Sequence, residues 1–298
     1  MTATRPRVVL VDGVPMSGLI AEAADPRAVI VAFHGGASTA AYFDCPGHPW
    51  LSMLRVGAAL GFTVVALDRP GYGASAPYPD AMQYPEQRVA LAFGAVDKIL
   101  GSNPRGAGLF LLAHSAGCEL AVRMTVDESA ERERLLGLEL AGTGLQYADD
   151  ATEILKTATS INRPTGLREL LWQPAHLYPA DVLSAMTNSA TGALYEAAMV
   201  KDWPGQDFPT LAARVRVPVQ FSVAGHERVW RSDAAALADI AAIFTASPRF
   251  VVNHQVDASH NLSLSINAAA YHLKVLSFVE ECVTARERVS ATAELEAG

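Results

Sequence analysis

One serine lies where a protein chain can hold a nucleophile. Ser115 stands in the segment AHSAG (residues 113–117), after the apolar run Gly108–Ala113 and before a helical pattern. A sharp strand-to-helix turn projects a serine hydroxyl above a sheet, and it requires small residues two positions before and two after the serine. Ala113 and Gly117 meet this requirement. The pattern predicts that Ser115 is a nucleophile; a purely structural turn is the alternative.

Around this serine the chain resembles the α/β-hydrolase superfamily, and the resemblance covers nearly its whole length. His34-Gly35-Gly36 is similar to the family's HG-type oxyanion loop, and residues 68–75 (DRPGYGAS) are similar to its D-x-x-G-x-G-x-S loop. The alanine at position 113 is a modest departure from the family motif G-x-S-x-G. The resemblance implies a fold and catalytic roles but no substrate, because one scaffold hosts many chemistries.

The resemblance also implies a histidine base late in the chain, since a serine hydroxyl needs a base to take its proton. His260 follows the last expected strand and precedes the final expected helix, so it is the candidate. His254 is the rival, but it falls within the apolar alternation of residues 250–256 and is interpreted as a sheet residue. We expect His34 to shape the oxyanion loop and the side chain of His114 to point away from the nucleophile.

The family's acid orients the imidazole and stabilises the imidazolium that forms. Glu227 follows Ala224-Gly225 at the end of an expected strand, where family members commonly carry Asp or Glu, and it is our candidate. Asp233 is interpreted as the cap of the next helix. Asp257 is a competitor because it lies close to the histidine in sequence. The family's other acid position, after the sixth strand, offers no acid in residues 141–144.

Two backbone N–H groups should form the oxyanion hole. One belongs to Ala116, directly after the nucleophile, and the other to Gly36 in the HGG loop. Glycine lets the backbone approach a substrate closely. The alternative is that HGG is only a flexible exit from a strand.

Short apolar runs that alternate with helical patterns must position these residues. The expected strands are Arg7–Val11, Met16–Ala21, Ala28–Phe33, Phe62–Leu67, Gly108–Ala113, Leu135–Leu140, Val217–Val223 and Arg249–Val256. The expected helices are Leu51–Leu60, Glu86–Leu100, Cys118–Val126, Asp233–Phe244 and about Leu262–Cys282. Strand–helix alternation predicts a mostly parallel sheet flanked by helices. The fold class is therefore α/β, and the resemblance makes it an α/β-hydrolase fold.

The alternation stops after the sixth main strand. We expect a core domain of residues 1–144 and 215–284, a helical cap or lid of residues 145–214, and a flexible tail of residues 285–298. Four cap side chains are candidate substrate contacts: Trp172, Trp203, Tyr178 and Met186. Packing of the cap onto the sheet domain is the alternative role for them.

Composition narrows the class of protein. Of 298 residues, 50% are hydrophobic and 18% are charged, which argues against wholesale disorder. The net charge of −8, without a basic stripe, argues against nucleic acid and anionic membranes as partners. Cys45, Cys118 and Cys282 form no CxxC pair, which disfavours a disulfide framework or zinc ribbon. Cys118 is expected to be packed and not reactive.

The sequence also lacks several motifs for export, membrane insertion and cofactor binding. No stretch has the features of a signal peptide and no run of 18 apolar residues occurs, so we expect a cytoplasmic, soluble protein. The chain lacks G-x-G-x-x-G at a strand–helix junction, a GK[ST] phosphate loop and HExxH. No metal or organic cofactor is therefore implied.

The leading hypothesis is a serine hydrolase that cleaves a carboxylic ester or thioester of a small, mainly apolar substrate through an acyl-enzyme on Ser115. One alternative keeps the same triad and moves the acyl group, for example a carrier-bound one, to a non-water acceptor in a biosynthetic pathway. A third hypothesis, from another class, is a non-catalytic ligand-binding protein on a hydrolase scaffold.

Overall fold

A computed structural model describes residues 2–156, 164–186 and 190–297. Its eight strands form one sheet in the order β1-β2-β4-β3-β5-β6-β7-β8. β2 pairs antiparallel with β1 and β4, and all other neighbours are parallel. The mostly parallel sheet is thus confirmed. The strands are β1 (Arg5–Val11), β2 (Val14–Ala21), β3 (Val29–Phe33), β4 (Thr63–Leu67), β5 (Leu109–His114), β6 (Leu135–Ala141), β7 (Val219–His226) and β8 (Phe250–Ser259).

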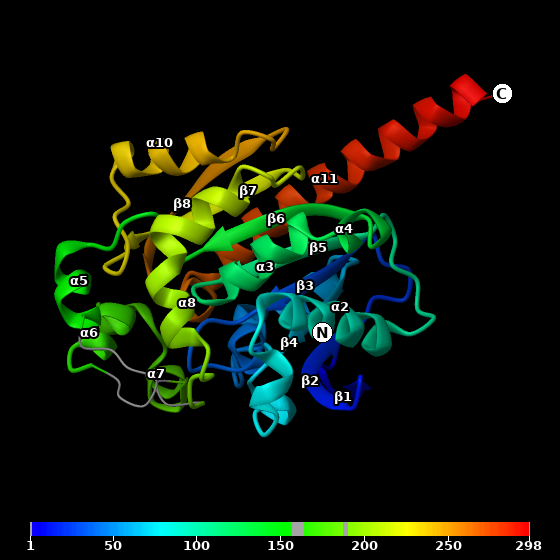
Figure 1. The fold of residues 1–298 in the computed structure, drawn as a ribbon. Helices are drawn as coiled ribbons and strands as arrows, with labels where there is room; N and C mark the ends of the chain where they lie inside the picture. The colour runs from blue at the N-terminus through cyan, green and yellow to red at the C-terminus, as the bar shows by residue number, and fades with distance from the viewer. Residues whose placement is uncertain (1, 157–163, 187–189, 298) are drawn as a thin grey trace.

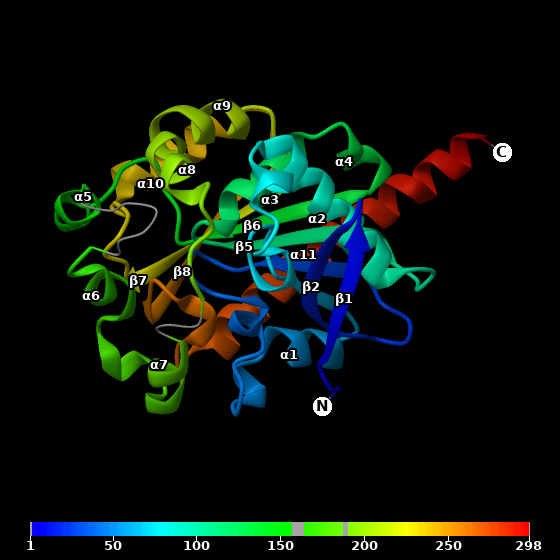
Figure 2. The ribbon, with the colours of Figure 1, turned by 60° about the horizontal axis from the view of Figure 1, so that its bottom comes forward.

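Helices cover both faces of the sheet, which explains why the central strands are continuous apolar runs. In β3, Val29, Val31 and Phe33 belong to one hydrophobic cluster, whereas Ile30 and Ala32 belong to the other. The first cluster packs under α2, α3, α9 (Phe208–Ala212) and α10, and the second under α1 and α11. Figure 2 shows α2, α3 and α9 above the sheet and α1 below it. The flanking helices are α1 (Met53–Ala59), α2 (Pro85–Leu100), α3 (Gly117–Val126), α10 (Ala234–Ile243) and α11 (Ala268–Ala297).

The last helix differs from the expectation at both ends. A short 3-10 turn, Leu262–Leu264, comes first, and α11 then runs from Ala268 to Ala297. Residues 285–297, expected as a flexible tail, therefore continue the helix, which projects from the body of the protein (Figure 1). Their Ala, Glu and Arg content favours helix. Arg27 also contacts Glu280 and Glu287 at 2.6 and 2.7 Å, so the core binds the start of the extension.

Helices replace strands between β6 and β7, as expected. The segment contains α5 (Asp149–Leu155), α6 (Leu167–Trp172), α7 (Ala180–Met186), α8 (Glu196–Asp202) and α9 (Phe208–Ala212). α5, α6 and α7 gather at one end of the sheet (Figures 1 and 2). α9 instead lies against α3, and its Phe208 and Ala212 are fully buried in the core. The end of the inserted segment thus flanks the sheet.

Short helical turns occupy the loops of the core. They are η1 (Ala40–Phe43), η2 (Pro49–Leu51), η3 (Gly73–Ser75), η4 (Pro79–Met82) and α4 (Ser129–Arg132), with η5 (Ala175–Leu177) and the π-turn η6 (Trp203–Asp207) in the inserted segment.

Candidate active site

Ser115 lies on a tight turn at the carboxyl end of β5. Its φ of 53° is in the left-handed region, which a residue with a side chain adopts only where the surroundings impose it. Its N–H donates to Ala141 O at 2.8 Å, and its carbonyl accepts from Cys118 N at 2.9 Å. A Cβ on Gly117 would lie 2.5 Å from Phe33 O, so this position must remain glycine.

Three side chains that are far apart in sequence converge above this turn. His260 Nε2 lies 3.1 Å from Ser115 Oγ. His260 Nδ1 lies 3.1 Å from both Glu227 Oε1 and Glu227 Oε2. The three residues predicted from the sequence therefore form one continuous hydrogen-bonded relay, with the imidazole between the hydroxyl and the carboxylate.

The Glu227 carboxylate is held as an anion. Burial alone would raise its pKa, but the His260 ring and hydrogen bonds from the backbone lower that pKa below its ordinary value. The backbone N–H groups of Arg228 and Val229 both donate to Oε1, at 3.1 and 2.8 Å. A charge held in this way can stabilise an imidazolium next to it.

The structure also shows how His260 is positioned, which sequence reasoning missed. His114 Nε2 donates to the His260 carbonyl at 2.9 Å, and burial holds the pKa of His114 well below its ordinary value. Gly142, at φ 66°, passes so close that an added Cβ would lie 3.0 Å from His260 Cε1. The hydrogen bond from His114 to a loop 146 residues later was not predictable from the sequence.

The rival residues lie elsewhere. His254 is an exposed residue of β8, paired with Val223. Asp233 caps α10, since its Oδ1 accepts from two backbone N–H groups of the first turn at 3.1 Å. Asp257 is exposed, and Cys118 is fully buried, with its pKa raised by burial.

The two expected oxyanion donors are neighbours. A Cβ placed on Gly36 would lie 3.9 Å from Ala116 Cβ, so the HGG loop and the turn after Ser115 come together. Gly36 is exposed, and Ser115 and Ala116 are half-buried. The gap above the hydroxyl is thus open to a reactant, whereas the ring and the carboxylate behind it are buried.

Comparison with known proteins fits this geometry. A model of the alpha/beta hydrolase family matches residues 29–271. The chain belongs to that family. Similar solved structures include an N-acyl homoserine lactonase mutant complexed with N-hexanoyl homoserine (TM-score 0.68, 15% identity, covering 94% of this chain and 98% of that one). A lipase in its open form (0.65, 15%, 94% and 99%) and a thioesterase domain from the curacin biosynthetic pathway (0.59, 16%, 93% and 99%) are also similar.

The cap aromatics of this alpha/beta hydrolase pack between cap and core. The rings of Trp172 and Tyr178 lie 5.1 Å apart, and the Tyr178 hydroxyl accepts from Asn261 N at 3.3 Å. Trp203 stacks on Phe208 at 4.8 Å. All of these rings are nearly buried, which supports the packing alternative for Trp172, Tyr178 and Trp203. The side chain of Met186, the fourth candidate, lies outside the described part of the structure.

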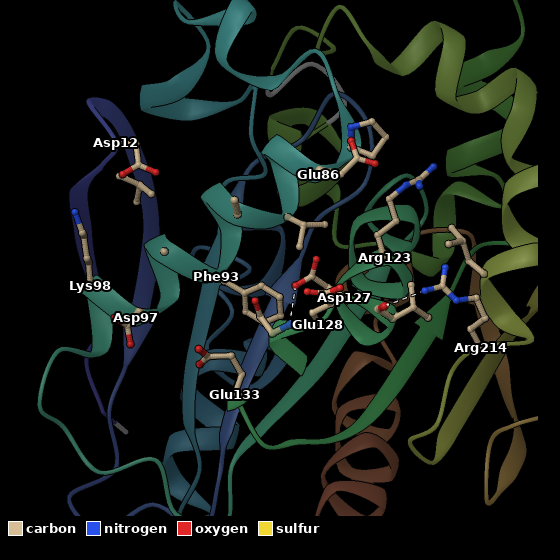
Figure 3. A pocket seen from close by; sticks show the side chains of 18 of the residues that line it. Asp12, Glu86, Phe93, Asp97, Lys98, Arg123, Asp127, Glu128, Glu133 and Arg214 are labelled. Atoms are coloured by element: carbon tan, nitrogen blue, oxygen red, sulfur yellow. Dashed lines mark hydrogen bonds between the residues drawn. The ribbon is translucent and has the colours of Figure 1, made fainter. Parts of the chain in front are cut away.

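Two cavities of this alpha/beta hydrolase lie away from the relay. One, of about 750 Å³, lies between α8 and the loop after β4 and is lined by side chains that include Met82, Tyr195 and Met199. The other is a groove of about 1070 Å³ along α2, and Figure 3 shows charges of both signs around it. No residue of the relay lines either cavity.

The described residues contain no group of three or more His, Cys, Asp or Glu side chains placed to hold a metal ion. Within the same part of the chain, no helix has both the length and the apolar character needed to cross a membrane.

Proposed function

We propose that the protein is a serine hydrolase that forms an acyl-enzyme on Ser115. The observation that carries this proposal is the hydrogen-bonded relay of Ser115, His260 and the buried carboxylate of Glu227. The distance from Ser115 Oγ to His260 Nε2 is 3.1 Å, and that from His260 Nδ1 to the carboxylate oxygens is also 3.1 Å. A buried carboxylate bonded to an imidazole orients the ring and stabilises its cation, which is the arrangement by which an imidazole activates a hydroxyl as a nucleophile.

The proposed reaction has two halves. His260 Nε2 takes the proton of Ser115 Oγ as that oxygen bonds to the acyl carbon, and the N–H groups of Gly36 and Ala116 stabilise the oxyanion. The imidazolium returns the proton to the leaving group as its bond to the carbonyl breaks. Water then attacks the acyl-enzyme by the same route and releases a carboxylic acid and free Ser115. Glu227 stabilises the imidazolium in both halves.

We propose a carboxylic ester or thioester of a small, mainly apolar molecule as the substrate. The similar structures named as a lipase, a thioesterase domain and a lactonase support acyl chemistry, although likeness at this level of identity concerns the fold. The small, mainly apolar character proposed for the substrate follows the sequence analysis, since neither cavity described above is lined by Ser115, His260 or Glu227.

The test compares Ser115→Ala with Ser102→Ala, a control that changes an exposed serine in a turn. We expect a fluorophosphonate probe to label the wild type and the control, but not Ser115→Ala. Turnover of p-nitrophenyl esters should fall by a factor of about 10⁴ or more in Ser115→Ala. Labelling or near-wild-type turnover in that variant would refute the proposal. Product analysis with added alcohols, amines and thiols separates hydrolysis from acyl transfer.

A further inference from the structure

A fully buried arginine lies beneath the HGG loop. Arg69 follows β4, and its Nη2 donates to Gly35 O at 3.1 Å. His34 Nδ1 lies 2.7 Å from the same oxygen. Because His34 Nε2 accepts the Arg69 backbone N–H at 3.1 Å, the ring proton is on Nδ1, which donates to Gly35 O. Two donors therefore fix the direction of this single carbonyl.

The direction of that carbonyl sets the direction of the neighbouring N–H. The peptide group between Gly35 and Gly36 is planar and trans, so its C=O and N–H point in opposite directions. Since Gly35 O points toward Arg69 and His34 in the interior, the Gly36 N–H points the other way. A charged donor on the carbonyl also polarises the peptide and strengthens its N–H as a donor.

The other side of the loop is held by a tyrosine. The Tyr72 hydroxyl accepts from Ala37 N at 3.0 Å and donates to Glu196 Oε2 at 2.6 Å. Ala37 has a φ of 53°, a left-handed conformation that an alanine keeps only where its surroundings impose it. The loop of Gly35, Gly36 and Ala37 is thus held on both sides of its central glycine.

Arg69 and Tyr72, which hold the two sides of the loop, both donate to one carboxylate of the inserted segment. Glu196, the first residue of α8, accepts from Arg69 Nη2 through Oε1 and from Tyr72 through Oε2. Burial acts to lower the pKa of Arg69, but the Glu196 carboxylate raises it above its ordinary value, so the guanidinium stays charged. Glu196 Oε2 also lies 3.4 Å from the position of a Cβ on Gly36. The carboxylate therefore sits directly beside the expected oxyanion hole.

We propose that Glu196, Arg69 and Tyr72 are positioning residues that set the oxyanion loop, so that the docking of α8 controls the catalytic competence of Ser115. This inference rests on the proposed function. When α8 is docked, the Glu196 carboxylate neutralises Arg69 and orients both Arg69 and Tyr72 toward the loop. When it is not, the guanidinium and the phenol lose their shared partner, and the Gly36 N–H loses its fixed direction.

The test is Glu196→Ala, with Asp181→Ala as the matched control. Asp181 makes another contact between the inserted segment and the core, to His48 Nε2 at 2.9 Å, but this pair is more exposed and does not touch the oxyanion loop. We expect kcat for a small p-nitrophenyl ester to fall about tenfold in Glu196→Ala, part of the 100- to 1000-fold loss typical for an oxyanion donor. KM should change less than twofold, and Asp181→Ala should match the wild type.

A second measurement distinguishes a positioning role of Glu196 from a general loss of structure in the variant. An alkyl boronic acid forms a tetrahedral adduct on a reactive serine, so its affinity reports on the oxyanion hole. We expect this affinity to fall in parallel with kcat in Glu196→Ala. Glu196→Gln, which keeps one acceptor oxygen but loses the charge that neutralises Arg69, should recover only part of it. Tyr72→Phe should lower kcat by a smaller factor, and its loss should not add to that of Glu196→Ala because both act through one loop.

The outcomes are distinguishable from those for the proposed function. If the wild type is not labelled by the fluorophosphonate, the proposed function fails. If the wild type is labelled and Glu196→Ala keeps its kcat and boronate affinity, only the inference is overturned. Equal losses in Asp181→Ala and Glu196→Ala would also overturn it, because any loosening of the inserted segment would then suffice. If Glu196→Ala does not fold, Tyr72→Phe decides by the same two readouts.

Discussion

Replacing Glu227 with glutamine tests the relay at its most informative point. The backbone N–H groups of Arg228 and Val229 both donate to Oε1, so in Glu227→Gln the amide oxygen should occupy that position. Both carboxylate oxygens lie 3.1 Å from His260 Nδ1, so the amide oxygen can still accept from that nitrogen while the amide NH₂ that replaces Oε2 also faces it. The variant therefore loses the negative charge beside the imidazole, and its NH₂ competes for Nδ1 in favour of the tautomer with the proton on Nε2, which cannot accept the proton of Ser115.

The loss of kcat/KM in Glu227→Gln can be estimated from the distance between the carboxylate and the imidazole. A unit charge 3.1 Å from the imidazolium contributes about 5 kcal/mol at an effective dielectric constant of about 20. At about 1.4 kcal/mol for each factor of ten, this corresponds to a loss of between about 10³ and 10⁴ in kcat/KM. The wrong tautomer is known to cost a serine triad about 10⁴, which is of the same order.

The assay is steady-state hydrolysis of a p-nitrophenyl ester at neutral pH. The control is Asp257→Asn, which removes an exposed carboxylate three residues before His260 and should keep wild-type kcat/KM. Urea unfolding of both variants verifies that they are folded. If folded Glu227→Gln retained kcat/KM within tenfold of the wild type, the role assigned to this carboxylate would be refuted.

Two further predictions concern the surroundings of the relay. Gly142→Ala would place a Cβ 3.0 Å from His260 Cε1, and we expect kcat/KM to fall about tenfold or more, while Gly101→Ala, also at positive φ (54°) but facing open space, should keep it. Buried His272 has a pKa lowered to about 3, so the unfolded chain binds its proton more readily and the free energy of unfolding should fall as pH drops below about 6.5. Between pH 7 and pH 5, the free energy of unfolding measured with urea should fall by about 2 kcal/mol less in His272→Leu than in the wild type. An equal fall in both proteins would contradict this prediction.

Much of the fold was predictable because burial on both faces of a sheet leaves a continuous apolar run. β3, β4 and β5 carry such runs and differ from the expected strands by one or two residues. The final helix was less predictable, because its ion pairs with Arg27 depend on tertiary contacts. From composition alone, a helical continuation of the last helix could not be distinguished from a flexible tail in residues 285–297.

Some residues of the candidate site could likewise be predicted from the sequence, and others could not. Ser115, Glu227 and His260 could be selected because each follows a recognisable strand at the position where the family resemblance implies a nucleophile, an acid or a histidine, and parallel strands bring their carboxyl ends together. Glu196 could not, since nothing in the local pattern of an irregular insertion indicates which side chain will reach the sheet domain. For Trp172 the sequence left two roles open, because a large ring in an insertion can fill the interface or contact a substrate, and in the structure it lies against Tyr178.

The path of the chain between β6 and β7 has a consequence for protein engineering. Parallel strands need a crossover, and α9 supplies it by lying against α3 with Phe208 in the core. Exchanging residues 145–202 for the equivalent region of another hydrolase would therefore leave the return path intact, whereas a graft that extends to residue 214 would remove it. Chimaeras meant to transfer substrate preference should be joined before Trp203, so that the recipient keeps its own return helix, and should retain a glutamate at position 196, whose carboxylate holds Arg69 and Tyr72.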